Sequence, residues 1–311
     1  MLTFFLFLEV NVAYKLKSVK ANNNVNKRFH FIKSKEEYIS KLKTILYDDY
    51  FEGVEISQMP FEGLMDEVVS LIKSAHMDYT YCGHSRLFKN KLNINSLDES
   101  ERLKAVEELK KGIDETHTIG AKEFQFLSRT YDKNKIAEHI AALAKSTREL
   151  CEYAKNFDIT VTLEIFDHTI DKCSLLGPID RVTAFLEQVK DIDNFGFMCD
   201  LSHIPMIGET IEENLTPIRD YIKHAHIGNT SIKDKNNVAY GDMHPRFGYE
   251  KGENDTAELT IFLQHLKDFG YLKEGGNNFL GFEVRPLPGE DERIVIANAK
   301  RCLNKAWRLV H

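Results

Sequence analysis

The chain has 311 residues, of which 42% are hydrophobic and 29% charged, so it can bury a large core. Its formal net charge of −7 argues against a general binder of nucleic acid or anionic membranes, because such proteins neutralise phosphate with clustered Lys and Arg. The five cysteines are scattered and form no C-x-x-C pair. This pattern indicates neither a zinc knuckle nor a disulfide framework and favours a reduced, cytoplasmic protein.

Short apolar runs alternate along the chain with longer amphipathic segments, which is the pattern of strands followed by helices. The apolar opening at 1–10 is too short to span a membrane and lacks a signal-peptide cleavage pattern, so we interpret it as the first strand. Further strands are predicted at 51–57, 78–83, 120–128, 160–167, 195–200, 223–228 and 279–284. Helices are predicted at 34–50, 61–76, 100–119, 133–157, 181–190, 210–221, 256–270 and 291–310. The polar stretches 84–100 and 229–255 are predicted to be loops, the first of them facing a substrate.

About eight strand–helix units follow one another without a linker or a break in composition. Alternating strands and helices produce a parallel sheet, and no unit has the features of an edge strand. The order therefore favours one closed (β/α)₈ TIM barrel over residues 1–311. No glycine-rich phosphate-binding motif follows the first strand, which argues against a nucleotide-binding fold.

Four predicted strands carry a metal-binding type of side chain near their C-terminal ends: Glu164, Asp200, His226 and Glu283. In a TIM barrel these ends converge on one face, where active sites lie. Each residue alone is more often part of a structural ion pair, but four at corresponding positions favour a common metal site. We predict one divalent ion there. Carboxylate ligands favour manganese or magnesium, and the histidine leaves cobalt and zinc open.

Five further residues near these ends are candidates for contact with a substrate. His203, in the turn DLSHIP, could contact the substrate, bind a second metal or simply begin a helix. His168 could be a base, a substrate contact or a surface residue. In the loop sequence GDMHPRFG, His244 could be a further ligand and Arg246 could hold a phosphate or carboxylate, unless the loop is merely solvated. Arg285 is a candidate partner for an anion or a hydroxyl group.

Two glutamates beside a metal suit proton transfer on a sugar. A metal that chelates a carbonyl and its neighbouring hydroxyl acidifies the C–H bond between them by stabilising an enediolate. One glutamate removes the proton and another group returns it, to the same carbon in epimerisation or to its neighbour in isomerisation. Glu164 and Glu283 come from strands about three apart, so they could lie on opposite sides of such a substrate.

Several motifs resemble the xylose-isomerase-like superfamily of sugar and sugar-phosphate isomerases and epimerases: GVEI, LEIFD, MCDLSHIP, HAHIGN, GDMHPRFG and GFEVRP, together with the segment 92–124. The resemblance begins near Glu52, and the first fifty residues match no family start. It implies a TIM barrel and a divalent metal held by the four residues named above. It also implies an acid/base role for the two glutamates and a substrate contact for His203.

Two features of the sequence leave other functions open. The stretch 229–255 replaces the Gly-rich, Arg-bearing loop typical of ketose 3-epimerases. The combination of LEIFDH…DK with GDMHPRFG also resembles the catalytic subunits of C-glycoside-cleaving enzymes, which work with a smaller partner subunit. There the metal would stabilise an enolate of a 3-keto sugar, and His168 would be the acid/base. An apurinic endonuclease would need more metal-binding histidines and a basic DNA face, and a non-catalytic barrel would have lost a ligand.

We therefore predict a cytoplasmic, metal-dependent isomerase or epimerase that acts on a small carbohydrate and binds neither nucleic acid nor membranes. It is expected to form a homo-oligomer, or to carry a small partner subunit if it cleaves a C-glycoside. The catalytic residues are predicted to be Glu164, Glu283 and His168, and the substrate-binding residues His203, His244, Arg246 and Arg285.

Overall fold

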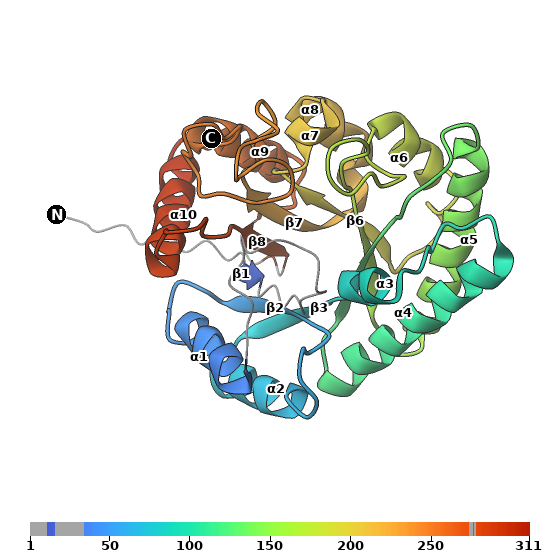
Figure 1. The fold of residues 1–311 in the computed structure, drawn as a ribbon, viewed down its shortest axis with the longest axis horizontal. Helices are drawn as coiled ribbons and strands as arrows, with labels where there is room; N and C mark the ends of the chain where they lie inside the picture. The colour runs from blue at the N-terminus through green and yellow to red at the C-terminus, as the bar shows by residue number, and fades with distance from the viewer. Residues whose placement is uncertain (1–10, 16–33, 274–275, 277) are drawn as a thin grey trace.

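Eight parallel strands close into a barrel in chain order and helices surround them, which confirms the predicted TIM barrel (Figure 1). The computed structural model describes residues 11–15, 34–273, 276 and 278–311. The strands are β1 (Asn11–Lys15), β2 (Gly53–Ser57), β3 (Asp78–Cys82), β4 (Glu123–Leu127), β5 (Thr160–Glu164), β6 (Phe195–Asp200), β7 (Ile222–Gly228) and β8 (Phe279–Glu283).

Strands β2 to β8 coincide with predicted strands, whereas the predicted first strand at 1–10 lies outside the described residues. No strand was predicted at β1, which follows directly after that stretch. Its sequence, NVAYK, has too little apolar alternation to indicate a strand by itself. Parallel pairing with β2 on one side and β8 on the other defines it and closes the barrel.

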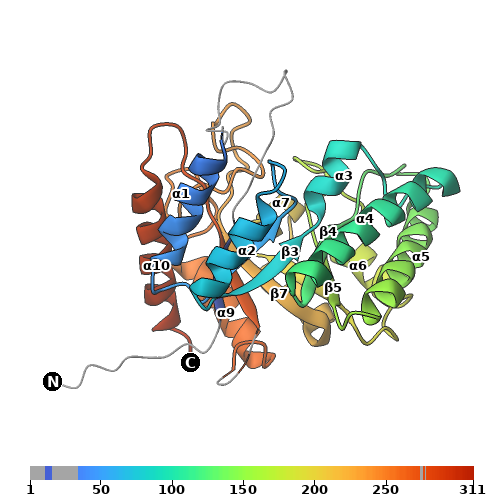
Figure 2. The same ribbon diagram turned by 90° about the horizontal axis from the view of Figure 1, so that it is seen from below.

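Helices follow the strands and cover the outside of the barrel, with α1, α2 and α10 on one side and α4 and α5 on the other (Figure 2). Their bounds are α1 (Lys35–Leu46), α2 (Met65–Ser74), α3 (His84–Asn90), α4 (Glu99–Ile119), α5 (Ile136–Lys155), α6 (Ile179–Leu186), α7 (Ile204–Ile207), α8 (Ile211–Leu215), the 3₁₀ helix η1 (Thr216–Tyr221), α9 (Thr256–Asp268) and α10 (Glu292–Trp307). No helix of the described residues is long and apolar enough to cross a membrane.

One loop prediction and one helix prediction were wrong in detail. The stretch 84–100, predicted to be a loop, begins with α3, a helix whose first residue is the buried His84. The helix predicted at 210–221 is divided into α8 and η1, because Pro217 cannot donate a backbone hydrogen bond at the junction. Ser34 caps α1, since its side chain accepts a hydrogen bond from the N–H of Glu37 at 3.2 Å.

The apolar residues between the strands and the helices form one continuous core. Phe124 on β4 is fully buried, and its ring stacks on that of Tyr81 of β3 at a centroid distance of 6.0 Å. Gly112 allows α4 to pack closely on this pair, because a Cβ at that position would lie 2.7 Å from the Phe124 ring. The core thereby fixes β3 and β4 in the barrel wall next to β5.

Replacing Phe124 with alanine is expected to lower the free energy of unfolding by about 3–5 kcal/mol, because the substitution leaves a cavity that this packing cannot fill. Urea denaturation followed by circular dichroism measures the change. Ile261→Ala on α9, where the side chain is 51% exposed, is the control and should cost no more than about 0.5 kcal/mol. Equal losses in the two variants would contradict this account of the core.

Candidate metal centre

The four predicted metal ligands meet in one buried group at the C-terminal ends of β5 to β8. Strand register aligns Glu164 with Met198, Asp200 with His226, and Gly228 with Glu283, so neighbouring strands bring the four side chains to one level. One potential ligand atom from each lies within 4.8 Å of the others. The four residues are 0% to 4% exposed, so their charged groups are almost completely shielded from water.

His226 lies between the two glutamates of this group. Its Nδ1 is 3.0 Å from Glu283 Oε2 and 3.8 Å from Glu164 Oε1. Asp200 is held by the backbone N–H of Ser202, which donates to Oδ1 at 2.7 Å. The arrangement offers three carboxylates and one imidazole around a common point, which is a suitable donor set for a divalent cation.

The electrostatics of the group also fit a cation. Burial raises the pKa of Asp200, and the nearby Glu283 carboxylate adds to the effect. Burial alone would lower the pKa of His203, but the carboxylates of Asp200, Glu164 and Asp242 raise it to about 9. Three carboxylates gathered out of water are costly unless positive charge offsets them, and a divalent ion would supply that charge.

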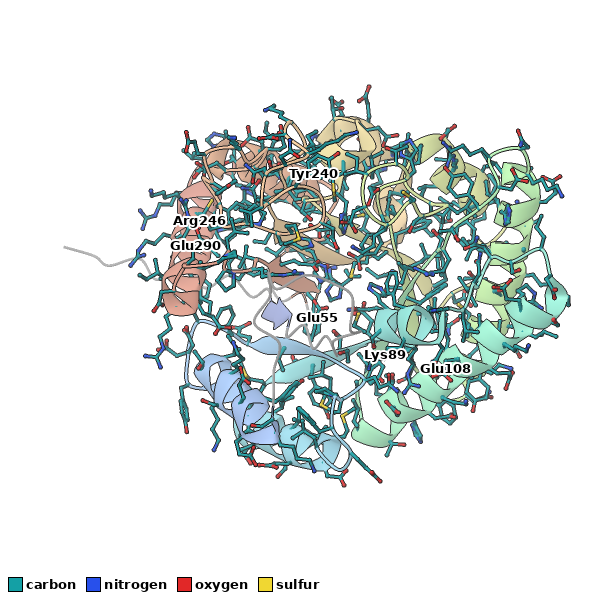
Figure 3. The ribbon with its side chains drawn as sticks, viewed as in Figure 1. Glu55, Lys89, Glu108, Tyr240, Arg246 and Glu290 are labelled. Carbon is teal, nitrogen blue, oxygen red and sulfur yellow. The ribbon has the colours of Figure 1, made fainter. Side chains whose placement is uncertain are left out.

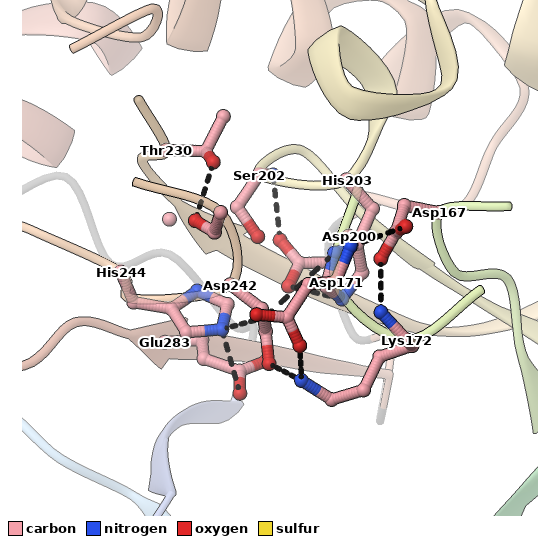
Figure 4. A network of polar contacts seen from close by, with 12 residues as sticks. Asp167, Asp171, Lys172, Asp200, Ser202, His203, Thr230, Asp242, His244 and Glu283 are labelled. Carbon is pink, nitrogen blue, oxygen red and sulfur yellow. Dashed lines mark hydrogen bonds and ion pairs between the residues drawn. The ribbon is translucent and has the colours of Figure 1, made fainter. Parts of the chain in front are cut away.

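Two predicted substrate-binding histidines, His203 and His244, lie beside the candidate ligands Asp200 and Glu283 (Figure 4). His203 Nε2 is 3.3 Å from Glu164 Oε1 and 3.4 Å from Asp200 Oδ2. His244 Nε2 is 3.4 Å from Glu283 Oε1. Asp242 lies between the two histidines, with Oδ1 2.5 Å from His244 Nε2 and 3.9 Å from His203 Nδ1. Their position suits a substrate contact, which stays a prediction.

Lys172 joins the loop after β5 to the loop after β7 (Figure 4). Its ammonium group donates to Asp242 Oδ2 at 2.5 Å and to Asp171 Oδ1 at 2.6 Å. The turn that carries Lys172 is organised by Asp167, whose buried carboxylate accepts the backbone N–H groups of residues 169–173 at 2.7–3.5 Å. The stretch 229–255 thus reaches the four-residue group through Asp242 and His244.

Gly228 ends β7 where the backbone of β8 and the loop residue His244 come close together. A Cβ at this position would lie 2.6 Å from the carbonyl oxygen of Glu283 and 3.3 Å from His244 Nδ1. His244 itself has a φ of 47°, in the left-handed region. Glycine at 228 therefore lets the loop turn back onto the ligand strand.

The structure does not bring the other predicted residues into this group. Arg246 pairs with Glu290 at 3.0 Å, beside α10 and away from the barrel axis (Figure 3). His168 is half-buried and lines a separate pocket of about 200 Å³ with Tyr131 and Cys173. The backbone N–H of Arg285 donates to the carbonyl of His244 at 2.7 Å. Their catalytic or substrate-binding roles stay predictions.

Two residues that contact the candidate ligands were not predicted from the sequence. His84 Nδ1, at the start of α3, is 3.4 Å from Glu164 Oε2. Glu55 Oε1, on β2, is 2.5 Å from His226 Nε2. The signal for Glu55 was present, because it is a carboxylate inside an apolar strand, as Glu164 is. His84 gave a weaker signal, since it stands at the start of a stretch interpreted as a loop.

Residues 48–300 match the family of xylose isomerase-like TIM barrels. The chain belongs to this family. The resemblance found in the sequence motifs is thereby confirmed, and the match leaves out most of the first fifty residues, as expected. No curated protein is significantly similar to the chain.

Solved structures with this fold include several sugar epimerases. A D-tagatose 3-epimerase-like protein has a TM-score of 0.70 and 18% identity, with 97% of this chain and 98% of that chain covered. An L-ribulose 3-epimerase has a TM-score of 0.68 and 18% identity, with 96% of each chain covered. A 3-keto-D-glucoside 4-epimerase from E. coli has a TM-score of 0.64 and 15% identity, with 97% and 99% covered. At these identities the likeness shows a common fold.

Replacing Asp167 with alanine is expected to loosen the turn at 169–173, because it removes the acceptor of five backbone N–H groups. Amide hydrogen exchange in this turn should become about tenfold faster or more, and the free energy of unfolding should fall by about 1–3 kcal/mol. Exchange followed by mass spectrometry and urea denaturation measure the two effects. Asp191→Ala removes an exposed carboxylate that pairs with Arg148 and is the control. Unchanged exchange in Asp167→Ala would contradict the assigned role.

Proposed function

We propose that this protein is a divalent-metal-dependent isomerase or epimerase of a small sugar or sugar derivative. The observation that carries the proposal is the buried group of Glu164, Asp200, His226 and Glu283 at the C-terminal ends of four adjacent strands. Family membership and the likeness to sugar epimerase structures support the substrate class. A bound divalent ion would polarise a carbonyl and a hydroxyl of the sugar and so acidify the C–H bond between them.

The two glutamates are proposed to move the proton. Glu164 ends β5 and Glu283 ends β8, with β6 and β7 between them, so they approach the centre from different sides. One carboxylate would remove the proton from carbon and the other would return one, to the opposite face in an epimerase. Their burial keeps water away from the carbanionic carbon and limits protonation from solvent.

His203 and His244 are proposed to hold the hydroxyl groups of the sugar. Both are buried, and each contacts one of the two glutamates, so a substrate hydroxyl bound here would lie next to the group that transfers the proton. Asp242 contacts both rings and limits their rotation. The carboxylate-rich donor set favours manganese as the resident ion, with magnesium, cobalt and zinc as alternatives.

Glu164→Gln and Glu283→Gln are each expected to lower turnover about 10²- to 10⁴-fold, because an amide cannot accept the proton. The assay incubates the enzyme with D-tagatose, L-ribulose and related ketoses in D₂O, and NMR identifies the product and the carbon that acquires deuterium. Deuterium on the inverted carbon indicates epimerisation, and deuterium on the neighbouring carbon with an aldose product indicates isomerisation.

Glu107→Gln on the exposed face of α4 is the matched control and should retain full turnover. Full activity of either Glu164→Gln or Glu283→Gln would contradict the roles assigned to these residues. A different result would be a protein that shows no activity on ketoses, cleaves a C-glycoside of a 3-keto sugar and co-purifies with a small subunit. That result would favour the C-glycoside-cleaving alternative over the proposal.

Treatment with a chelator is expected to abolish turnover, and Mn²⁺ added after dialysis should restore it, because the proton transfer needs the polarising ion. The folded barrel should survive the treatment, since its core is formed without the ion. Circular dichroism before and after chelation checks the fold, and elemental analysis of the untreated protein identifies the resident metal. Undiminished turnover in metal-free protein would rule out a metal-dependent reaction.

A further inference from the structure

The barrel interior next to the metal centre contains a chain of charged side chains where apolar layers are usual. Glu55 Oε1 on β2 contacts two histidines of β7: His226 Nε2 at 2.5 Å and His224 Nε2 at 3.0 Å. His224 Nδ1 in turn lies 3.0 Å from Glu123 Oε1 on β4. Glu55 and both histidines are buried, and Figure 3 shows Glu55 at the centre of the barrel.

The two nitrogens of His226 face different partners. Nδ1 is turned toward the carboxylates of the metal group, with Glu283 Oε2 at 3.0 Å, whereas Nε2 is turned toward Glu55. A neutral imidazole carries its proton on one nitrogen and has a lone pair for a metal on the other. Which nitrogen is protonated depends on the hydrogen bond that the ring makes. A carboxylate at Nε2 therefore favours the tautomer with the proton on Nε2 and the lone pair on Nδ1.

Gly281 on β8 makes room for the contact between Glu55 and His226. It is the register partner of His226, and a Cβ there would lie 2.8 Å from both Glu55 Oε1 and His226 Cδ2. Any larger residue would force the two side chains apart. The close approach therefore depends on three strands, since β2 supplies the carboxylate, β7 the imidazole and β8 the space.

We propose that Glu55 is a positioning residue that holds His226 as its Nε2–H tautomer, with Nδ1 directed to the metal. The inference rests on the proposed metal-dependent function and adds a residue that acts through a ligand without touching the ion. Carboxylates that accept the second N–H of a ligating histidine typically strengthen metal binding about 10- to 100-fold.

The test compares Mn²⁺ affinity in metal-stripped wild type, Glu55→Gln and Glu123→Gln, by titration calorimetry. Glu55→Gln is expected to weaken the affinity about 10- to 100-fold, because the amide is a weaker acceptor for the Nε2 proton. Glu123→Gln is the control. It alters a carboxylate of the same chain that contacts His224 but not His226, and it should change the affinity by less than about twofold. Circular dichroism of the metal-free proteins checks that each is folded.

The tautomer of His226 gives a readout that a purely structural role of Glu55 would not change. In ¹⁵N-histidine-labelled protein loaded with diamagnetic Zn²⁺, the signal lost in His226→Gln should report Nε2–H in the wild type and a mixture of tautomers in Glu55→Gln. If Glu55→Gln does not fold, Gly281→Ala takes its place and should give the same two changes, because its methyl group separates the pair.

The outcomes separate the two proposals. Unchanged Mn²⁺ affinity and an unchanged tautomer in Glu55→Gln, with normal Mn²⁺ binding by the wild type, would overturn the role of Glu55 alone. Equal losses of affinity in Glu55→Gln and Glu123→Gln would also overturn it, because the chain would then act as one structural unit. If the wild type binds none of Mn²⁺, Mg²⁺, Co²⁺ and Zn²⁺, the proposed metal-dependent function itself is contradicted.

Discussion

The site depends on one electrostatic constraint, which is that three carboxylates converge out of water at the ends of β5, β6 and β8. Such a group is stable only when positive charge or proton donors surround it. The structure meets this need in two layers. Histidines contact the carboxylates directly, and beyond them Lys172 pairs with Asp242, which itself contacts two of those histidines. A divalent ion at the common point would complete this balance, which is why the geometry and the proposed chemistry agree.

Strands and loops contribute to the site in different ways. The residues that would hold the ion and move the proton stand on strands, whose register and buried packing fix them relative to one another. The residues that would meet the sugar stand on the turns after β6 and β7, and the 229–255 stretch differs from the loop expected of ketose 3-epimerases. Substrate choice is therefore expected to reside in this stretch and the turn held by Asp167, while the strands set the reaction class.

The barrel and the grouping of the four candidate ligands could be predicted because both have local signals. A carboxylate or histidine near the end of an apolar strand is visible in the sequence, and parallel strands bring such ends together whatever the exact register. The contact of Glu55 with His226 could not be predicted, since it joins β2 to β7 across the barrel and depends on which interior layer each side chain enters. β1 was not predicted for a related reason, because it is defined by its pairing with β2 and β8 and not by its own sequence. Pro217 divided a predicted helix that amphipathic spacing alone favoured.

The interior chain from Glu123 through His224 and Glu55 to His226 bears on why this barrel is not filled by apolar layers. Buried ion pairs contribute little net stability compared with well-packed apolar residues, so stability alone is a poor reason for this arrangement. Orientation is a better one. A metal ligand needs one defined tautomer and one ring position, and a carboxylate fixed in the barrel wall provides both without touching the ion. The polar interior is thus best understood as a continuation of the candidate metal site into the barrel. Glycine at position 281 leaves the space in which Glu55 and His226 can approach each other.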